Sequence, residues 1–263
     1  MRLALGFPFR NESDASHQSP VAPALSFLIG YSSVRDLLRP LLRPEHKILH
    51  LGCGNSDLSR DLYMDGYHHI TNIDFSQASI TAQRERNKDC PEMTWLVMDM
   101  LELKQHFACE EFDIVLDKCT LDALVVDEGD AWNPKPEVRV QVDQVLTGVS
   151  HILKSNGGMY LQLSFGQPIH RLNHYFEKEK YNWFVTVANW GDGIGFGYFF
   201  YKMTRTPSTD PRLRQYYESK QREKDENEAR LRQFAEERQR ALEMESEDED
   251  VNGEKLFAMG DVF

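Results

Sequence analysis

Short apolar runs alternate with segments of helical periodicity over most of the chain. A run of four to eight apolar residues favours a buried strand, and apolar residues spaced three and four apart favour a helix. Strands that alternate with helices are typical of a parallel sheet covered on both faces, so the pattern predicts an α/β fold. The strands are expected at 47–54, 70–75, 94–100, 112–118 and 157–165, and the helices at 32–42, 55–66, 76–88 and 136–153.

The last two apolar runs break this alternation. They cover 183–190 and 196–203 and are separated only by the glycine-rich link GDGIG, Gly191–Gly195. A link this short joins neighbouring strands in a hairpin, whereas a parallel pair needs a crossover of a dozen or more residues. The sequence therefore predicts a mostly parallel sheet with an antiparallel C-terminal hairpin.

Composition divides the chain into three parts. Residues 1–24 are rich in proline and small polar residues, which predicts an irregular segment. The regular pattern fills 25–204 and predicts one domain. Residues 205–263 contain few apolar and many charged residues, so we expect a charged helical segment followed by an acidic, disordered tail.

The balance of charges limits the classes of partner. The chain carries 30 Lys and Arg against 42 Asp and Glu, a formal net charge of −12. Such a field repels phosphate backbones and disfavours a nucleic acid, whereas it suits a basic protein. No apolar run approaches the roughly 18–20 residues of a membrane span. The four cysteines form no CxxC pair, so we expect reduced thiols and no metal site.

The segment ILHLGCGNSDLS, at 48–59, carries the clearest chemical signal. A strand ends, two glycines follow, and a helix begins. Gly52 and Gly54 let the backbone approach a ligand, which the free N–H groups at the start of the helix can bind. Asp74 ends the second strand 22 residues beyond Gly52, a spacing that suits a carboxylate holding the two hydroxyls of an adenosine ribose. A helix cap is the alternative role for Asp74.

Two further strand ends indicate which adenosine cofactor binds. A dinucleotide site has a small residue at the third position of its glycine motif, and Asp57 at that position would repel a pyrophosphate. S-adenosylmethionine has no phosphate and carries a sulfonium cation. Asp99 and Met100 end the third strand, where a carboxylate can accept from the adenine amino group and a methionine can cover the ring. Asp117 and Lys118 end the fourth strand, where the methionine moiety would lie, so the sequence predicts S-adenosylmethionine.

Four runs along the chain resemble one known family. LGCGNSDLS, NIDFS (72–76), MDM (98–100) and LDKCTLDAL (116–124) are similar to the class I methyltransferases of the methyltransferase-like 13 group, over roughly residues 26–204. That group includes lysine methyltransferases of translation elongation factor 1-alpha and of mitochondrial citrate synthase. The resemblance implies a Rossmann-like, seven-strand methyltransferase sheet. It also implies cofactor contacts at Phe27, Gly52, Asp74, Phe75, Asp99, Met100 and Lys118.

The chain departs from the family pattern at two places. The Tyr-Trp-Asp segment that helps to close the family's cofactor site is missing from 1–24, and Ser26–Leu28 replaces an Asp-Trp-Phe run. The family's glycine after the fourth-strand lysine is Cys119 here, which we interpret as a small buried residue. Because the Tyr-Trp-Asp segment is missing, the N-terminal residues are expected to close the cofactor site differently from those of the family.

Methyl transfer to lysine needs an unprotonated amine, because an ammonium group has no lone pair. Free lysine has a pKa of about 10.4, and burial beside a sulfonium would lower that pKa. Asp117 and Asp122 follow the fourth strand, where the acceptor must enter, and are the candidates to accept the proton or orient the amine. A helix cap or a surface acid is the alternative for Asp122. No Asn/Asp-Pro-Pro-Tyr segment follows the fourth strand, which argues against methylation of adenine or glutamine.

We therefore expect an enzyme that methylates a lysine of a basic protein, such as elongation factor 1-alpha, in the cytoplasm. Mitochondrial citrate synthase is an alternative substrate. The first ten residues carry two arginines, as an import signal does, but Glu12 and Asp14 follow at once, which disfavours import. A small-molecule methyltransferase and a cofactor-binding regulator without catalysis are the remaining alternatives.

Overall fold

The computed structural model describes residues 30–126, 129–130, 133–175, 178–181, 183–190 and 197–205, and further along the chain 219, 222, 226–227 and 229–240. The chain divides into two compact units, Met1–Pro207 and Ser208–Phe263. In the second unit, residues 229–240 are helical and exposed. The predicted irregular segment 1–24 and the predicted cofactor contact Phe27 lie outside the described residues, and the predicted domain boundaries stay predictions.

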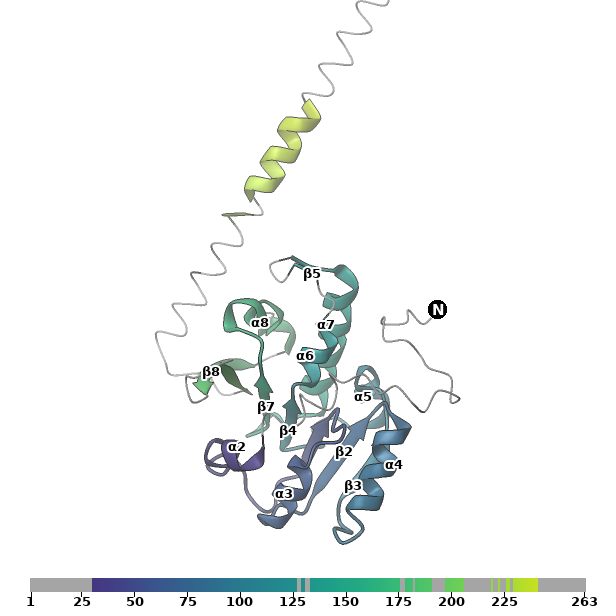
Figure 1. Cartoon of the computed structure of the whole chain (residues 1–263). Helices are drawn as coiled ribbons and strands as arrows, with labels where there is room; N and C mark the ends of the chain where they lie inside the picture. Colours follow the sequence, from purple (N-terminus) through teal and green to yellow (C-terminus); the bar gives the residue numbers. More distant parts are fainter. Residues whose placement is uncertain are drawn as a thin grey trace, which may run out of the picture. The chain divides into compact units, whose positions relative to one another are not determined.

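A seven-stranded sheet forms the centre of the first unit (Figure 1). Its strands are β1 (Ile48–Leu51), β2 (Ile70–Asp74), β3 (Thr94–Val97), β4 (Ile114–Lys118), β7 (Met159–Ser164), β8 (Phe184–Trp190) and β9 (Tyr198–Thr204). Their order across the sheet is β3-β2-β1-β4-β7-β9-β8. Pairs from β3 to β7 are parallel, whereas β9 runs antiparallel to both β7 and β8. The predicted parallel sheet with an antiparallel C-terminal hairpin is therefore confirmed.

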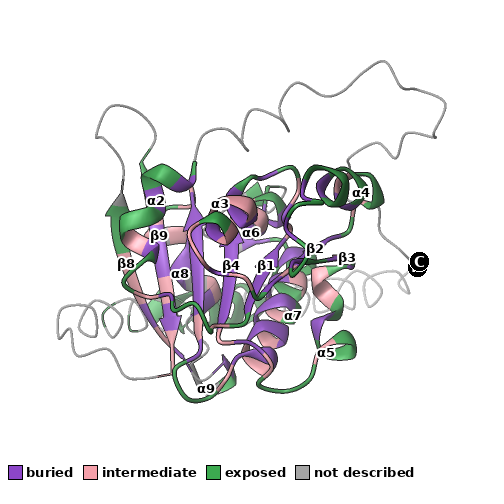
Figure 2. Cartoon of the chain, turned by 90° about the horizontal axis from the view of Figure 1, so that it is seen from below, coloured by how far each residue is buried: buried purple, intermediate pink, exposed green. Residues whose placement is uncertain are grey.

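Helices cover both faces of this sheet (Figure 2). One face carries α2 (Tyr31–Leu38), α3 (Leu58–Met64) and α4 (Gln77–Arg86), and the other carries α5 (Leu103–His106), α7 (Pro136–Ile152) and α9 (Lys178–Tyr181). Two short helices, α6 (Thr120–Leu124) and α8 (Pro168–Tyr175), follow the ends of β4 and β7, and the two-residue strands β5 (Gly129–Asp130) and β6 (Asn133–Pro134) pair between α6 and α7. None of the described helices is both long enough and apolar enough to cross a membrane.

Burial on both faces of the sheet explains the unbroken apolar runs of the central strands. All four residues of β1 are buried. From one face α7 packs an apolar stripe onto the sheet, and every member of that stripe is at most 4% exposed: Val138, Val142, Val145, Val149 and Ile152. Close packing on both sides makes the strands a rigid base, and this base fixes where the loop after each strand begins.

The third strand ends earlier than its sequence predicts. It stops at Val97, and the 3₁₀ helix η1 (Met100–Glu102) takes up the last of the predicted strand residues. The Leu101 N–H donates a hydrogen bond to Oδ1 of Asp99 (2.9 Å), so Asp99 caps this short helix. A side chain that satisfies the first free N–H groups of a helix favours the helix over further strand pairing, which explains the early end.

One edge of the sheet collects the ends of five parallel strands. The carboxyl ends of β1, β2, β3, β4 and β7 lie there because these strands run the same way. The first residue of β9, Tyr198, lies at the same edge because β9 runs the opposite way, with Phe199 in register with Ser164. Ligands of open α/β sheets bind outside the carboxyl ends of the strands, so this edge is where we expect the site.

Candidate active site at the carboxyl edge of the sheet

The loop after β1 needs glycine at two positions. Gly52 and Gly54 have φ angles of +53° and +48°, in the left-handed region that side chains disfavour. A Cβ atom on Gly52 would also lie 2.3 Å from Cγ2 of Thr120, which comes from the loop after β4. The Thr120 hydroxyl donates to the carbonyl oxygen of Leu51 (2.8 Å). Gly52 therefore lets the loops after β1 and β4 pack directly on each other, and Gly54 supplies the second positive φ that the loop after β1 needs.

Asp74 joins the end of β2 to this glycine loop. Its Oδ2 accepts from the Gly54 N–H and its Oδ1 from the Ser76 N–H, both at 2.8 Å. From below, the Gln83 amide donates to the carbonyl oxygens of Gly54 (3.0 Å) and Ser56 (2.9 Å). A carboxylate offers about four acceptor positions, so each Asp74 oxygen keeps capacity for a further donor such as a ribose hydroxyl. Ser76, rather than Asp74, caps α4 through its own side chain.

An exposed aromatic ring stands beside this carboxylate. Phe75 directly follows Asp74 and is 80% exposed, which is unusual for so large an apolar side chain. Asp99 is exposed and Met100 half-buried at the end of the neighbouring strand β3. An apolar face flanked by carboxylate acceptors suits a flat ring with an amino group on its rim, as adenine has. The predicted cofactor contacts on β1, β2 and β3 are thus brought together at one edge.

Lys118 ends β4 above a buried polar network. Burial lowers the pKa of the half-buried Lys118 ammonium. His50 on β1 is 1% exposed, and burial followed by the charge of Lys118 lowers its pKa to about 3, so the imidazole is neutral. Its Nδ1 lies 2.7 Å from the Ser59 hydroxyl, which donates to the side-chain oxygen of Asn72. Lys118 therefore brings a positive charge to the predicted methionine end of the cofactor, and the buried His50, Ser59 and Asn72 near it are uncharged.

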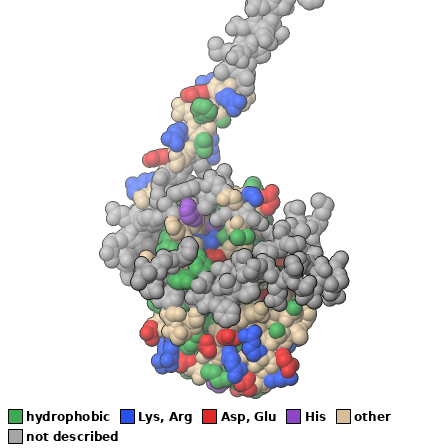
Figure 3. Space-filling view, in the orientation of Figure 1, with side chains coloured by type: hydrophobic (Ala, Val, Ile, Leu, Met, Phe, Trp, Pro, Cys, Tyr) green, Lys and Arg blue, Asp and Glu red, His purple; other side chains and the backbone are tan. Residues whose placement is uncertain are grey.

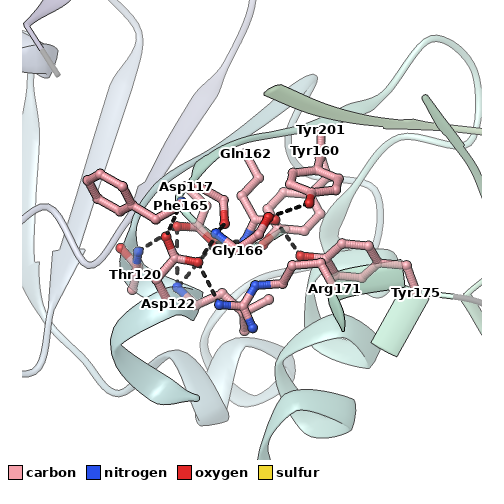
Figure 4. Close-up of polar contacts among 12 residues, drawn as sticks. Asp117, Thr120, Asp122, Tyr160, Gln162, Phe165, Gly166, Arg171, Tyr175 and Tyr201 are labelled. Atoms are coloured by element: carbon pink, nitrogen blue, oxygen red, sulfur yellow. Dashed lines mark hydrogen bonds and ion pairs between the residues drawn. The ribbon is translucent and has the colours of Figure 1, made fainter. Parts of the chain in front are cut away.

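The structure places Asp117 differently from its predicted position at the rim of the site. The side chain is buried, with 2% of the residue exposed, and its oxygens accept from the Thr120 N–H (2.7 Å), the Tyr160 hydroxyl (2.8 Å) and the Gln162 amide (2.9 Å) (Figure 4). Burial, and next the nearby charge of Asp122, raise its pKa to about 6. The expected place of Asp117 at the rim is therefore wrong, because the carboxylate is buried among protein donors, and its role toward the lysine amine stays a prediction.

Asp122 likewise has its acceptor positions filled by the protein. Its Oδ1 accepts from the Ser164 hydroxyl (2.6 Å) and from Nη2 of Arg171 (2.7 Å), and its Oδ2 accepts from the Phe165 N–H (2.9 Å). The side chains of Asp122 and Arg171 are only 14% and 6% exposed. Asp122 is therefore neither the helix cap nor the surface acid of the alternative interpretation, because its hydrogen bonds go to β7 and α8. Its part in proton transfer stays a prediction.

Sequence reasoning missed the residues that enclose these two carboxylates. Tyr160, Gln162 and Ser164 alternate along β7 and share one face, from which each donates to Asp117 or Asp122. The Tyr175 hydroxyl on α8 donates in turn to the Gln162 side-chain oxygen. A signal was present in the run YLQLS, because polar residues at every second position of a buried strand need polar partners. Arg171 gave no such signal, since it comes from a helix that the periodicity did not reveal.

A seven-strand sheet with a glycine loop after its first strand and carboxylates at the ends of the next two is typical of α/β proteins that bind a ligand at the carboxyl edge of the sheet. A family model described as a methyltransferase domain matches residues 42–192, and the chain belongs to that family. The solved structure of TrmN from Thermus thermophilus superposes with a TM-score of 0.52 at 16% identity, over 69% of this chain and 52% of that one. This likeness confirms the predicted fold. The described residues contain no group of three His, Cys, Asp or Glu side chains placed to hold a metal ion.

Two curated relatives match the same part of the chain. The EEF1A lysine methyltransferase 4 of Bos taurus is 39% identical over 169 residues, which are 64% of this chain and 65% of the relative. The eEF1A lysine and N-terminal methyltransferase of Mus musculus is 42% identical over 139 residues, 52% of this chain and 18% of the relative. The resemblance to this group of methyltransferases is thereby confirmed. The matched part is less than two thirds of either relative.

Proposed function

We propose that the protein is an S-adenosylmethionine-dependent methyltransferase that modifies a lysine side chain of a protein, with elongation factor 1-alpha as the substrate. The observation that carries the proposal is the cradle formed by Gly54 and Asp74, in which the carboxylate orders the glycine loop and keeps acceptor capacity for a ribose. The choice of substrate is supported by the two relatives, whose names describe eEF1A lysine methyltransferases.

The residues at the carboxyl edge fit this cofactor. Asp74 would hold the ribose hydroxyls, and the glycine loop of Gly52 and Gly54 would lie against the nucleoside. The remaining contacts are proposed at Phe75 and Met100 for the faces of the adenine, at Asp99 for its amino group, at Lys118 for the methionine carboxylate, and at Phe27. When bound, S-adenosylmethionine supplies a methyl group carried on a sulfonium. A cation of this kind is compatible with the carboxylates that surround the site.

The protein must present the lysine as a free amine and exclude water around it. An amine in a poorly hydrated site loses its proton more easily, because burial disfavours the charged form. The oxygens of Asp117 and Asp122 already accept several protein hydrogen bonds. We therefore propose that the lysine proton leaves to solvent as the amine enters, that Asp117 shapes the site instead of receiving this proton, and that Asp122 helps to orient the amine.

A basic protein substrate is consistent with the charge of the chain. The net charge of −12 favours approach of a basic surface by long-range attraction. Acidic and basic side chains are nevertheless interspersed on the lower part of the face shown in Figure 3. The attraction is therefore expected to come from the overall field and not from one acidic patch in this view. We place the reaction in the cytoplasm, as a further part of this proposal.

The test is transfer of labelled methyl groups to purified, unmethylated elongation factor 1-alpha, followed by mass spectrometry of the labelled peptide. We expect label on lysine with the wild type and none with Asp74→Ala. Asp36→Ala, which removes an exposed carboxylate on α2, is the control and should retain activity. Tight cofactor binding without labelled protein would favour a non-catalytic regulator. Label on citrate synthase in a lysate would name that substrate instead, and label in metabolites would indicate a small-molecule methyltransferase.

A further inference from the structure

The strand order fixes where the acceptor amine enters the site. The predicted adenosine contacts lie at the ends of β2 and β3, and the glycine loop lies at β1. The next strands across the sheet are β4, β7 and β9, so the reacting end of the cofactor and the acceptor belong above these ends. This placement rests on the proposed function, because it assumes that S-adenosylmethionine is the cofactor.

Two aromatic side chains meet at this part of the edge. Phe165 directly follows β7, and Tyr198 begins β9 beside it. Their ring centroids are 4.9 Å apart and the ring planes are tilted by 52°. Both residues are half-buried and pack, together with Cys119 from the loop after β4, against the same core cluster. An aromatic pair therefore borders the position that the strand order assigns to the acceptor.

Three contacts fix the backbone of Phe165 and of Gly166, which follows it. Its N–H donates to Oδ2 of Asp122, whose other oxygen is paired with Arg171. The Tyr201 hydroxyl donates to the carbonyl oxygen of Gly166 (2.5 Å). A Cβ atom on Gly166 would lie 2.4 Å from Nε of Arg171, so the guanidinium packs tightly against the bare loop. Figure 4 shows the Phe165 ring directed away from the Asp122–Arg171 pair, so the pair orients the ring without covering it.

A buried ion pair is a poor source of stability, since well-packed apolar residues of similar size are often as stable or more so. The Asp122–Arg171 pair does supply a fixed geometry. If either side chain moves away, the other is left as an uncompensated buried charge, which is destabilising. The geometry fixed here is that of the loop that carries Phe165. An aromatic face attracts a cation by about 2 kcal/mol where water is excluded, so such a face can bind the ammonium group of a lysine side chain.

We propose that Phe165 and Tyr198 form the aromatic wall that receives the side-chain nitrogen of the substrate lysine, and that Asp122 and Arg171 are the positioning pair that orients Phe165. The wall binds the lysine ammonium through its π faces on arrival. It also limits the water around the nitrogen once the proton has left. The ligand it recognises is thus an alkylammonium group on a protein, and methylated lysine would bind it as well.

The first test separates aromatic character from bulk at position 165. Phe165→Leu keeps the apolar volume and removes the π face, and Phe165→Tyr keeps the ring. With unmethylated elongation factor 1-alpha as the substrate, we expect Phe165→Leu to raise KM about tenfold and Phe165→Tyr to restore it to within about twofold. Binding of S-adenosylhomocysteine, measured by calorimetry, should stay the same in both variants.

A matched control comes from the other aromatic pair near the sheet. Phe107 is half-buried, and its ring meets that of Phe112 at a centroid distance of 5.0 Å, next to the start of β4 instead of its end. Phe107→Leu should leave KM for the protein substrate unchanged. If Phe165→Leu behaves like Phe107→Leu while the wild type methylates lysine, the aromatic wall is refuted and the proposed function stands. If the wild type methylates no lysine, the proposed function itself fails.

The second test concerns the positioning pair. Asp122→Asn keeps an oxygen for the Phe165 N–H but removes the charge opposite Arg171. We expect KM to rise and kcat to fall, each about threefold to tenfold, with unchanged S-adenosylhomocysteine binding. In the Phe165→Leu background the same change should have little further effect on KM, since the ring it orients is gone. Fully additive losses in the double variant would show that the pair acts independently of Phe165 and would refute its assignment as a positioning pair.

Discussion

The carboxyl edge of the sheet has two halves, one at the ends of β2 and β3 and the other at the end of β4. Both halves carry aspartates, but the hydrogen-bond partners of these aspartates differ. Asp74, at the end of β2, accepts one backbone hydrogen bond on each oxygen, and Asp99, near the end of β3, is exposed to solvent. Asp117, near the end of β4, and Asp122, beyond it, accept hydrogen bonds from side chains of β7 and α8 as well as from backbone. The first half keeps acceptor capacity for a ligand, and the second has used it within the protein.

The difference lies in what covers each carboxylate. The ends of β2 and β3 are followed by α4 and η1, which begin with local caps. Asp99 is exposed there, and Asp74 is buried, at 8% exposure, but its oxygens accept from backbone N–H groups. The end of β4 is enclosed by β7 and α8, whose polar residues face it. Position after a strand therefore identifies a residue near the site, but the number of protein donors around it decides whether it binds a ligand or holds the fold.

The largest expected effect is on stability, from removing the buried carboxylate in the second half. Asp117→Ala leaves the Tyr160 hydroxyl, the Gln162 amide and the Thr120 N–H without an acceptor. Unpaired buried donors cost about 1–3 kcal/mol each before relaxation, so we expect a loss of about 3–5 kcal/mol in the free energy of unfolding. Urea unfolding measures this loss. A variant with wild-type stability and a large fall in kcat would restore Asp117 as a direct participant in the reaction.

Removing the carboxylate of Asp74 in the first half should weaken cofactor binding more than it lowers the stability of the fold. Asp74→Ala removes the acceptor for the ribose and the anchor of the glycine loop. Two hydrogen bonds to a charged group are together worth about 3 kcal/mol or more, so we expect the Kd for S-adenosylhomocysteine to rise at least about 100-fold. Calorimetric titration measures this constant, with Asp36→Ala as the control. Unchanged affinity in Asp74→Ala would mean that the ribose lies elsewhere and would remove the contrast between the halves.

The protonation of Asp117 has a smaller effect on the free energy of unfolding, and this effect depends on pH. Its pKa is about 6 in the folded protein, against about 3.9 when unfolded. Between these values the folded state holds a proton that the unfolded state has released, so stability falls as the pH rises from 4 to 6. The group's contribution to this fall is about 2–3 kcal/mol. Comparing urea unfolding of the wild type and Asp117→Asn across this window isolates the contribution, and parallel curves for the two proteins would contradict it.

Local pattern predicted most of the fold because the strands and long helices have clear periodicity. The mostly parallel sheet and its antiparallel closure followed from alternation and from one short glycine link, Gly191–Gly195, whereas the strand order across the sheet was not predicted. The early end of β3 was not predicted, since a cap at Asp99 depends on one side chain and leaves the apolar pattern unchanged. The helices α6 and α8 were not predicted: the five residues of α6 are too few to establish a period, and no helical pattern was identified over the eight residues of α8.

The site was predictable to the extent that it depends on backbone. Gly52, Gly54 and Asp74 follow from the strand, turn and helix of one motif, and the structure brings them together. The roles expected of Asp117 and Asp122 depended on long-range partners, Tyr160 and Arg171, which lie 43 and 49 residues away from them in the chain. A sequence shows that two acids lie near the acceptor, but not which donors fold over to meet them.

The smallest expected effect concerns the residue that separates the two halves. Cys119 follows β4 with a φ of +60° and a ψ of +16°, a left-handed conformation that costs most residues about 1 kcal/mol. A positive φ favours glycine, which is the residue that the resemblance to the methyltransferase-like 13 group leads one to expect at this position. Cys119→Gly relieves that cost but adds a similar amount of unfolded-chain entropy, so its free energy of unfolding should stay within about 1 kcal/mol of the wild type.

A β-branched residue at the same position tests whether the backbone conformation is what matters. Cys119→Val cannot adopt a positive φ without further strain and should lose about 1–3 kcal/mol in urea unfolding. Cys109→Val is the matched control, because Cys109 is exposed and is not among the described residues with positive φ. If both valine variants are equally stable, the loop after β4 tolerates other conformations, and the positive φ of Cys119 is not a constraint on this loop.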